Sequence, residues 1–251
     1  MDTRAWFDFA GQVVVVNGGG GAIGREISLA FASHGAHVVV ADVDGTRAIQ
    51  VAEDAGSATA AQLDIRDGAS VERLIDTTWS RHGKIDVLVN TAAVYVRVPA
   101  VDLAESEFDR TMDTNVKGTW LFCQSAGRRM ISRGRGRIIN YASNAGMRGS
   151  PLQLAYNASK AAVISITKSL AVEWARTGVT VNGVAPGPTN TELMAPAFED
   201  PAMIEAFAQR IPQGSLTATD ATVGPVLFLA SPLAASITGH TFFADGGMSA
   251  T

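Results

Sequence analysis

Tyr156 and Lys160 are the residues of this sequence whose types and spacing are best suited to chemistry. They lie four positions apart in "YNASK", within residues 155–177, where small or apolar residues recur at helical intervals. Side chains with this spacing share one face of a helix. A tyrosine has an unperturbed pKa of about 10, and a nearby ammonium and a helix N-terminus both stabilise its phenolate. The pair is therefore a candidate for general acid–base catalysis at Tyr156.

Ser143 lies 13 residues before Tyr156, at the end of the stretch "RIINYAS". Ligands of open α/β sheets bind at the carboxyl ends of strands, so a strand ending at Ser143 and a helix starting near Tyr156 would converge on one substrate oxygen. Taken singly, Ser143 could be a turn serine and Lys160 a solvated charge. Their order along the chain favours a catalytic set.

The stretch "VVVVNGGGGAIGREI" contains a glycine run with two possible spacings. One uses Gly19, Gly21 and Gly24 as G-x-G-x-x-G, and the other uses Gly18, Ala22 and Gly24 as G-x-x-x-(small)-x-G. In both, a strand turns through glycine into a helix whose free N–H groups and dipole suit a pyrophosphate. A tight strand-to-helix turn without a ligand is the alternative.

Asp42 ends the next β-branched stretch, 18 residues after Gly24. An acid at this place can accept hydrogen bonds from an adenosine ribose and repel a 2′-phosphate. Val43 follows, and no Arg or Lys stands beside Asp42 in the sequence, so NAD is favoured over NADP. Asp64 could accept from an adenine amino group. Either acid could instead cap a helix.

The elements that must position these residues alternate along the chain. Strands are predicted at 13–17, 37–42, 58–64, 86–91, 137–143, 179–186 and 240–247, and helices at 22–33, 46–55, 70–81, 106–133 and 155–177, of which 106–133 is long enough for two. Such alternation predicts right-handed βαβ crossovers. The expected fold is a single α/β domain over residues 1–251, a Rossmann-type, doubly wound, seven-stranded parallel sheet with helices on both faces. Residues 187–216 are predicted to be a substrate loop or lid.

Composition excludes several other classes. The 251 residues are 47% hydrophobic and carry a net charge of −4, with no basic cluster for nucleic acid. Cys123 is the only cysteine, so no internal disulfide forms and no metal site is expected. No apolar run suits a signal peptide or a membrane helix, which predicts a cytoplasmic protein without nucleic-acid or membrane partners.

Taken together, the motifs resemble the short-chain dehydrogenase/reductase family along essentially the whole chain. The resemblance consists of the glycine loop, Asp64, "VLVNTAA", Asn115 in "MDTNVKGTW", Ser143, "YNASK", "VTVNGVAPGPTNTE" and "TGHTFFADGG". It implies an NAD(P)-dependent oxidoreductase that transfers hydride between NAD(H) and a secondary alcohol or ketone, with Tyr156 as general acid–base. It also implies a homotetramer.

The resemblance implies roles for individual residues. Asn115 would hold a water that links Lys160 to solvent, and Lys160 would also bind the nicotinamide ribose. The catalytic set would be Asn115, Ser143, Tyr156 and Lys160. Besides Tyr156 and Lys160, the cofactor would be bound by Asn17, Gly18, Gly21, Ala22, Ile23, Gly24, Asp42, Val43, Asp64, Ile65, Asn90, Ala92, Ala93, Pro186, Gly187, Thr189 and Thr191. The family usually has Thr and Gly where this chain has Asn17 and Ala22.

Substrate choice should be set by the segments around the nicotinamide. The candidates are Val94, Tyr95, Met147, Arg148, Leu152, Met194 and Phe198, which predict a mostly apolar pocket in which Arg148 could meet an acidic group. An NADP-dependent ketoreductase of the same fold, and a non-catalytic dinucleotide-binding sensor, are the alternative functions. Asp42 argues against the first, and an intact catalytic set argues against the second.

Overall fold

The computed structural model of the chain describes residues 6–197 and 201–251. Within these ranges lie the strands β1 (Val13–Asn17), β2 (His37–Asp42), β3 (Ala58–Gln62), β4 (Val87–Asn90), β5 (Gly136–Tyr141), β6 (Val179–Pro186) and β7 (Thr241–Ala244). The strands form one seven-stranded sheet in the order β3-β2-β1-β4-β5-β6-β7, and every pair is parallel. The predicted doubly wound sheet is confirmed.

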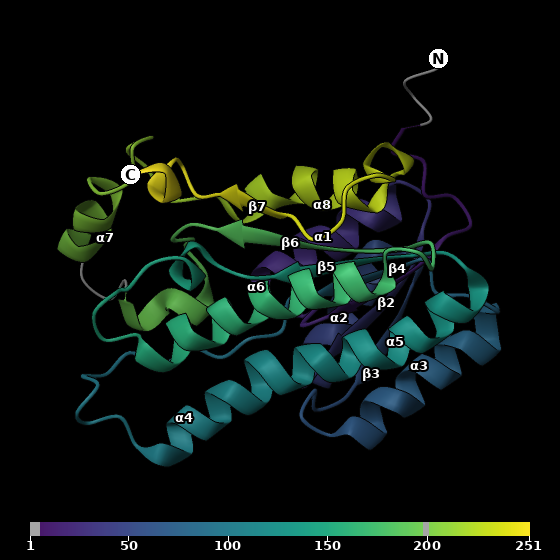
Figure 1. Ribbon diagram of the computed structural model, residues 1–251, viewed down its shortest axis with the longest axis horizontal. Helices are drawn as coiled ribbons and strands as arrows, with labels where there is room; N and C mark the ends of the chain where they lie inside the picture. The colour runs from purple at the N-terminus through teal and green to yellow at the C-terminus, as the bar shows by residue number, and fades with distance from the viewer. Residues whose placement is uncertain (1–5, 198–200) are drawn as a thin grey trace.

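Helices cover both faces of the sheet, as Figure 1 shows. They are α1 (Ala22–Ser33), α2 (Gly45–Ala55), α3 (Gly68–His82), α4 (Glu105–Met112), α5 (Thr119–Arg133), α6 (Leu154–Trp174), α7 (Pro201–Ala208) and α8 (Val223–Ala230). Local signals set several ends: Asp44 accepts hydrogen bonds from the first turn of α2, and Gly83 and Gly134 end α3 and α5 in the left-handed conformation.

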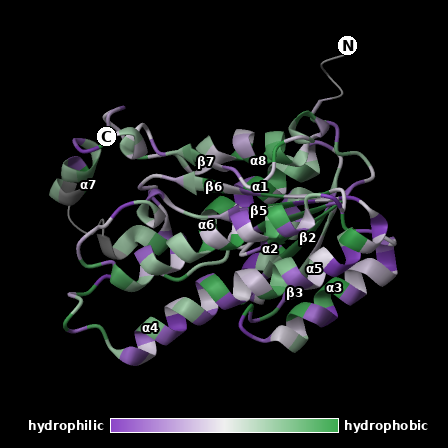
Figure 2. Cartoon of the chain, in the orientation of Figure 1, coloured by the Kyte–Doolittle hydropathy of each residue, from purple (hydrophilic) through white to green (hydrophobic). Residues whose placement is uncertain are grey.

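Two apolar cores follow from the alternation of side chains along the strands. On one face, strand valines such as Val14 and Val16 pack with Phe31 of α1 and Leu229 of α8. On the other face, a second set packs with Phe122 of α5 and with side chains of α3 and α6. Because both faces are covered, the central strands are apolar almost throughout, and the hydrophobic surfaces of the helices turn inward (Figure 2).

The stretch 106–133, predicted to be long enough for two helices, is helical throughout but contains a π-helical segment. A π-helix, Asp113–Gly118, joins α4 to α5, so the three segments run on as one rod (Figure 1). Single π-helical turns inside α-helices often mark functional positions. Asn115 lies in this turn.

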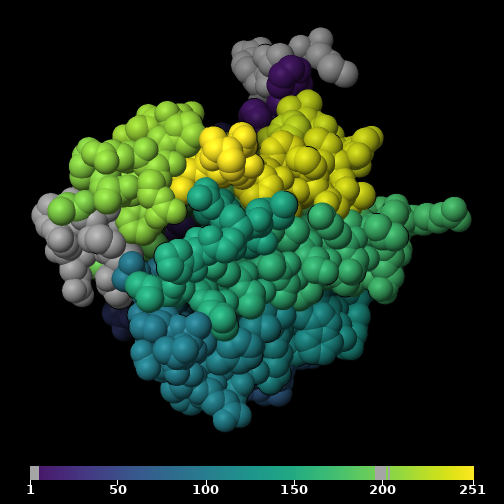
Figure 3. All heavy atoms as spheres, turned by 60° about the vertical axis from the view of Figure 1, so that its left-hand side comes forward, coloured from purple at the N-terminus to yellow at the C-terminus, as the bar shows by residue number. Residues whose placement is uncertain are grey.

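The carboxyl ends of the strands all meet at the side of the molecule where α7 lies (Figure 1). The predicted substrate loop contains a 3-10 helix, Glu192–Ala197, followed by α7. When this side is turned toward the viewer, the lime α7 segment lies next to the yellow C-terminal residues, above the teal and green surface of the central helices (Figure 3). In the part of the chain that the structure describes, no helix is long and apolar enough to cross a membrane.

Candidate active site

The glycine loop between β1 and α1 is held by steric contacts that select one of its two spacings. Gly18 has φ +71°, and a Cβ there would overlap the backbone nitrogen of Ala92. A Cβ on Gly24 would overlap the Gly18 carbonyl oxygen, whereas a Cβ on Gly21 would find its nearest neighbour at an ordinary 3.4 Å. The middle glycine of G-x-G-x-x-G is therefore not required, and Gly18 and Gly24 of the second spacing are.

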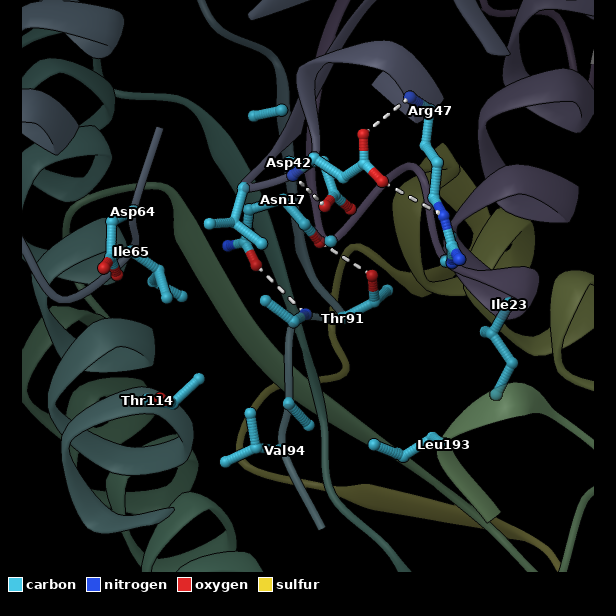
Figure 4. Close-up of a pocket in the computed structure, with 18 of the residues that line it drawn as sticks. Asn17, Ile23, Asp42, Arg47, Asp64, Ile65, Thr91, Val94, Thr114 and Leu193 are labelled. Carbon is cyan, nitrogen blue, oxygen red and sulfur yellow. Dashed lines mark hydrogen bonds and ion pairs between the residues drawn. The ribbon is translucent and has the colours of Figure 1, made fainter. Parts of the chain in front are cut away.

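A cavity of about 550 Å³ opens beside this loop, at the carboxyl ends of β1, β2 and β4 (Figure 4). Of the residues predicted to bind cofactor or substrate, fourteen line it: Asn17, Gly18, Gly21, Ala22, Ile23, Gly24, Asp42, Val43, Asp64, Ile65, Ala92, Ala93, Val94 and Thr191. The four candidate catalytic residues are not among its lining residues. Its remaining lining residues were not predicted: Ala41, Asp44, Arg47, Leu63, Arg66, Thr91, Arg110, Thr114, Phe122, Glu192 and Leu193.

The Asp42 carboxylate is fixed at the mouth of the glycine loop. Its Oδ2 accepts from the Gly20 backbone N–H at 2.9 Å, and its Oδ1 accepts from the Asp44 N–H at 3.0 Å. Each oxygen keeps a lone pair that a ribose hydroxyl can use. The position of Asp42 therefore suits the ribose role that the sequence predicted.

The prediction that no cation lies beside Asp42 is wrong, because the fold brings Arg47 next to it. A Cβ on Gly20 would lie 2.8 Å from the Arg47 Cβ and 3.1 Å from the Asp42 carboxylate, so both side chains flank the same glycine. The first turn of α2 folds Arg47 back toward β2, and sequence adjacency could not reveal it. A charged residue one turn into the helix after Asp42 was the signal that could have found it.

Asp64 lies at the other end of the cavity and is paired with Arg66, which was not among the predicted site residues. The Arg66 guanidinium contacts the Asp64 carboxylate at 2.6 Å, and this hydrogen bond holds the Asp64 pKa below its usual range. Arg66 also lines the cavity. An adenine amino group would therefore meet a carboxylate that is already engaged with a cation.

Three buried amides lie side by side across the central strands, directly beneath the glycine loop. Asn17, Asn90 and Asn140 occupy matching positions of β1, β4 and β5. The Asn17 amide donates to Asn90, Asn90 donates to Asn140 at 2.7 Å, and Asn140 donates to Thr167 of α6 at 3.0 Å. The Asn17 side-chain oxygen, Oδ1, accepts from the Ala92 N–H at 3.2 Å. Asn90 thus supports the loop from beneath and does not line the cavity.

Tyr156 is buried in the first turn of α6, beside Ser143. Burial raises its pKa to about 12, while a hydrogen bond with the Ser143 side chain acts in the opposite direction. Ser143 follows β5, where its hydroxyl also accepts from the Ala145 N–H at 3.2 Å. The two hydroxyls that the sequence placed together are adjacent. Desolvation outweighs the influences that lower the Tyr156 pKa, so the protein's own groups leave it above its usual value.

Lys160 lies one turn further along α6. Its Nζ is 5.7 Å from the centre of the Tyr156 ring and donates a hydrogen bond of 2.8 Å to the Tyr141 carbonyl oxygen. Burial lowers the Lys160 pKa to about 8. The amine can therefore gain or lose a proton near physiological pH, whereas an exposed lysine stays protonated.

Asn115 uses its side chain to fix two neighbouring segments. Its amide donates to the Val94 carbonyl oxygen at 2.9 Å and to the Ser159 hydroxyl at 3.0 Å, and its oxygen accepts from the Val94 N–H at 2.8 Å. Val94 lines the cavity, and Ser159 lies beside Lys160 on α6. Asn115 therefore ties the cavity wall to the helix that carries the candidate catalytic pair. A water held by Asn115 stays a prediction.

The residues predicted to flank the nicotinamide after β6 pack against the C-terminal segment. A Cβ on Gly187 would lie 2.9 Å from the Asp245 Cα, and the Thr189 hydroxyl donates to the Gly187 carbonyl oxygen at 3.0 Å. Pro186 ends β6, and only Thr191 of this group reaches the lining of the cavity.

The predicted substrate residues lie in different surroundings. The Tyr95 ring meets the Tyr156 ring edge-on, with centroids 5.1 Å apart, and the Leu152 carbonyl oxygen accepts from Val98 at 2.9 Å. Met147 is 60% exposed, and the Arg148 guanidinium donates from Nη1 to the Met248 carbonyl oxygen at 3.0 Å. A contact of Arg148 with an acidic substrate group stays a prediction. Met194 is half-buried, and Phe198 lies outside the described residues.

Tyr95, beside Tyr156, has polar neighbours. Burial raises the Tyr95 pKa, which the neighbouring Arg97 and Gln153 act to lower. The Tyr95 hydroxyl and the Arg97 Nε are buried, and neither has a hydrogen-bond partner of normal geometry among the described residues. The sequence analysis predicted Tyr95 for a mostly apolar pocket but named neither Arg97 nor Gln153, whose guanidinium and amide groups act on the Tyr95 hydroxyl. That the pocket is mostly apolar stays a prediction.

A doubly wound sheet with a glycine loop, an acid at the end of the second strand and a buried Tyr-Lys pair is the arrangement expected of a nicotinamide-dependent oxidoreductase. A family model described as enoyl-(acyl carrier protein) reductase matches residues 12–249. The chain belongs to the short-chain dehydrogenase/reductase family, as its motifs predicted, and it is an oxidoreductase that transfers hydride with a nicotinamide cofactor.

Its relatives differ in the cofactor that their names print. The D-threitol dehydrogenase of Mycolicibacterium smegmatis is 37% identical over 247 residues, covering 96% of this chain and 95% of the relative. The NAD-dependent glycerol dehydrogenase of Listeria innocua is 35% identical over 242 residues, with 96% and 95% covered. A gluconate 5-dehydrogenase of Burkholderia cenocepacia, solved with NADP and tartrate, superposes with a TM-score of 0.94 at 33% identity and covers 99% of each chain.

Proposed function

We propose that this protein is an NAD-preferring dehydrogenase that oxidises a secondary hydroxyl of a polyol, or reduces the corresponding ketone. The observation that carries the proposal is the buried group of Tyr156, Ser143 and Lys160, whose helix α6 is tied through Asn115 to the cavity-lining Val94. A sensor that only binds dinucleotide has no need of a desolvated lysine beside a desolvated tyrosine, because burying both costs stability.

The residues around the cavity fit a nicotinamide dinucleotide. The close packing at Gly18 and Gly24 leaves the backbone of the loop open to phosphates at the start of α1, and Asp42 offers two fixed carboxylate oxygens to a ribose. When bound, the cofactor supplies the acceptor or donor of hydride. Thr191, Glu192 and Leu193 of the loop after β6 line the cavity.

The protein's own groups would handle the proton. Ser143 would hold the substrate oxygen by a hydrogen bond while Tyr156 accepts the hydroxyl proton, or donates it in the reverse direction. With a ligand-free pKa of about 12, Tyr156 needs added positive charge to act near neutral pH. The Lys160 amine supplies part of it when protonated, and the oxidised nicotinamide ring is also cationic.

A polyol is favoured over a simple alcohol by the polar groups beside Tyr156. The Tyr95 hydroxyl, the Arg97 Nε and the Gln153 amide could hydrogen-bond hydroxyls next to the one that reacts. Buried polar groups without partners disfavour an apolar ligand, because such a ligand would leave them unpaired. The polyol dehydrogenases among the relatives agree with this choice.

The test is a 340 nm assay of the purified protein with threitol, glycerol, sorbitol, galactitol and gluconate, and with aliphatic secondary alcohols for comparison, each with NAD and with NADP. We expect turnover of at least one polyol with NAD as the better cofactor. Tyr156→Phe should abolish turnover and leave NADH binding unchanged in calorimetry. Substantial residual turnover in this variant would refute the role of Tyr156.

We also propose the homotetramer that the family resemblance implies. It is supported by large apolar side chains that stay exposed on two neighbouring helices, Val172 and Leu154 of α6 and Trp120 of α5. Sedimentation equilibrium measures the assembly directly.

A further inference from the structure

One ion pair joins the two sides of the cofactor cavity. The Arg47 guanidinium lies 2.5 Å from the Glu192 carboxylate, and the two residues are 145 positions apart in the chain. Arg47 belongs to the first turn of α2, on the adenosine side, and Glu192 begins the 3-10 helix that follows Thr191. Both side chains line the cavity. The pair therefore links the ribose corner to the substrate loop.

Arg47 is also the cavity-lining arginine that lies beside Asp42. Its side chain and the Asp42 carboxylate flank Gly20. Figure 4 shows Arg47 and Asp42 on the same wall of the cavity. A phosphate on the ribose that Asp42 binds would thus meet a carboxylate and, next to it, a guanidinium that can form two parallel hydrogen bonds with phosphate oxygens.

The guanidinium is not free to take that phosphate. Its Nη1 contacts Glu192, and its Nε lies 3.3 Å from the Asp44 carboxylate, so two acids share one cation while Asp42 stands beside them. A 2′-phosphate carries a charge of about −2 near neutral pH. To pair with the guanidinium through the edge that Glu192 now uses, it would have to displace Glu192, and a phosphate that reached the remaining Nη2 would meet the negative charges of Glu192 and Asp44. A 2′-hydroxyl makes no such demand.

We propose that Glu192 is a cofactor-specificity residue of this enzyme: by holding Arg47 from the substrate loop, it withholds from NADP the cation that the 2′-phosphate requires. Cofactor choice is then linked to the substrate loop, since NADP binds with the loop contact broken and NAD binds with it intact. This inference rests on the proposed NAD preference, but its test measures a change caused by Glu192 and not the preference itself.

The test compares dissociation constants of NADH and NADPH by calorimetry, without substrate and without turnover. Glu192→Gln keeps the size of the side chain and removes its charge. We expect NADPH to bind roughly 3- to 10-fold more tightly, the range for an exposed arginine that exchanges a carboxylate for a phosphate, while NADH affinity changes less than about 2-fold. The gain should shrink between 50 and 300 mM NaCl, because salt screens exposed charges.

Two further variants identify the cause. In Glu192→Gln combined with Arg47→Ala, the NADPH gain should disappear, because the released guanidinium is absent. Asp54→Asn is the matched control: Asp54 also lies on α2 and pairs with an arginine, Arg25, at 3.0 Å, but neither residue lines the cavity. It should leave the NADPH to NADH ratio unchanged.

The proposal is overturned if Glu192→Gln leaves the ratio of NADPH to NADH affinity unchanged. It is also overturned if the gain in NADPH affinity persists when Arg47 is replaced as well. If the unmodified protein prefers NADPH, the proposed NAD preference fails, but the shift caused by Glu192 is still measured. If calorimetry shows the shift and no polyol is oxidised, the specificity role stands and the proposed substrate class falls.

Discussion

Replacing Asn140 with leucine should destabilise the protein far more than the loss of one amide at the surface. Asn140 is fully buried in β5, where it links the amide chain beneath the glycine loop to Thr167 of α6. Its side-chain oxygen, Oδ1, accepts from Asn90 at 2.7 Å and from the Cys123 thiol at 3.4 Å, and its side-chain amide donates to Thr167 at 3.0 Å. Leucine has nearly the same size and can satisfy none of them.

The magnitude follows from the partners left behind. A buried polar group without a partner costs about 1–3 kcal/mol. The Asn90 N–H and the Thr167 oxygen lose good hydrogen bonds and the thiol loses a weak one, which gives an expected loss of about 3 kcal/mol in the free energy of unfolding. For a protein of this size, that corresponds to a fall in Tm of about 6 to 12 °C.

The measurement is urea unfolding together with calorimetric melting, at one protein concentration and one pH. Gln50→Met is the matched control: it also replaces an amide with an apolar chain, but the Gln50 amide lies exposed on α2 and donates to Asp54. Its effect should stay within about 0.5 kcal/mol. If Asn140→Leu costs less than about 1 kcal/mol, the amide chain does not stabilise the sheet as argued. NADH affinity should also fall in this variant, because the chain ends at Asn17 in the loop.

Two other predictions test the loop and the candidate catalytic lysine. Gly24→Ala should sharply weaken NADH binding or folding, because its Cβ would overlap the Gly18 carbonyl oxygen. Gly21→Ala should leave NADH affinity within about 2-fold of the unmodified protein. Calorimetry that finds the same NADH affinity in both variants would contradict the proposed spacing. Lys160→Met should abolish turnover and raise the unfolding free energy by up to about 3 kcal/mol at pH 7, because burial lowers the lysine pKa from 10.5 to about 8. Since the unfolded chain holds that proton up to a higher pH than the folded one, the gain should shrink as the pH rises from 8 to 10.5, and a gain independent of pH would argue against this cause.

Much of the fold could be predicted from local signals. The β-branched runs at 13–17, 37–42 and 179–186 match their strands residue for residue, because a strand buried on both faces must be apolar throughout. The alternation of strands and helices then predicted the parallel sheet that the structure shows. The π-helical turn at Asp113–Gly118 was not predicted, because its pattern of apolar residues is the same as that of an uninterrupted helix.

The sequence by itself determined which groups could do chemistry: Tyr156 and Lys160 by their spacing on one helix, Ser143 by its place after a strand, and Asp42 by its distance from the glycines. These are local relations, and helix and strand geometry converts them directly into proximity. Only the tertiary structure decided how those groups behave. Burial raises the Tyr156 pKa and lowers that of Lys160, because desolvation depends on everything packed around a group. The contact of Arg47 with Glu192, 145 residues away, likewise exists only because the sheet brings the ends of β2 and β6 to the same edge.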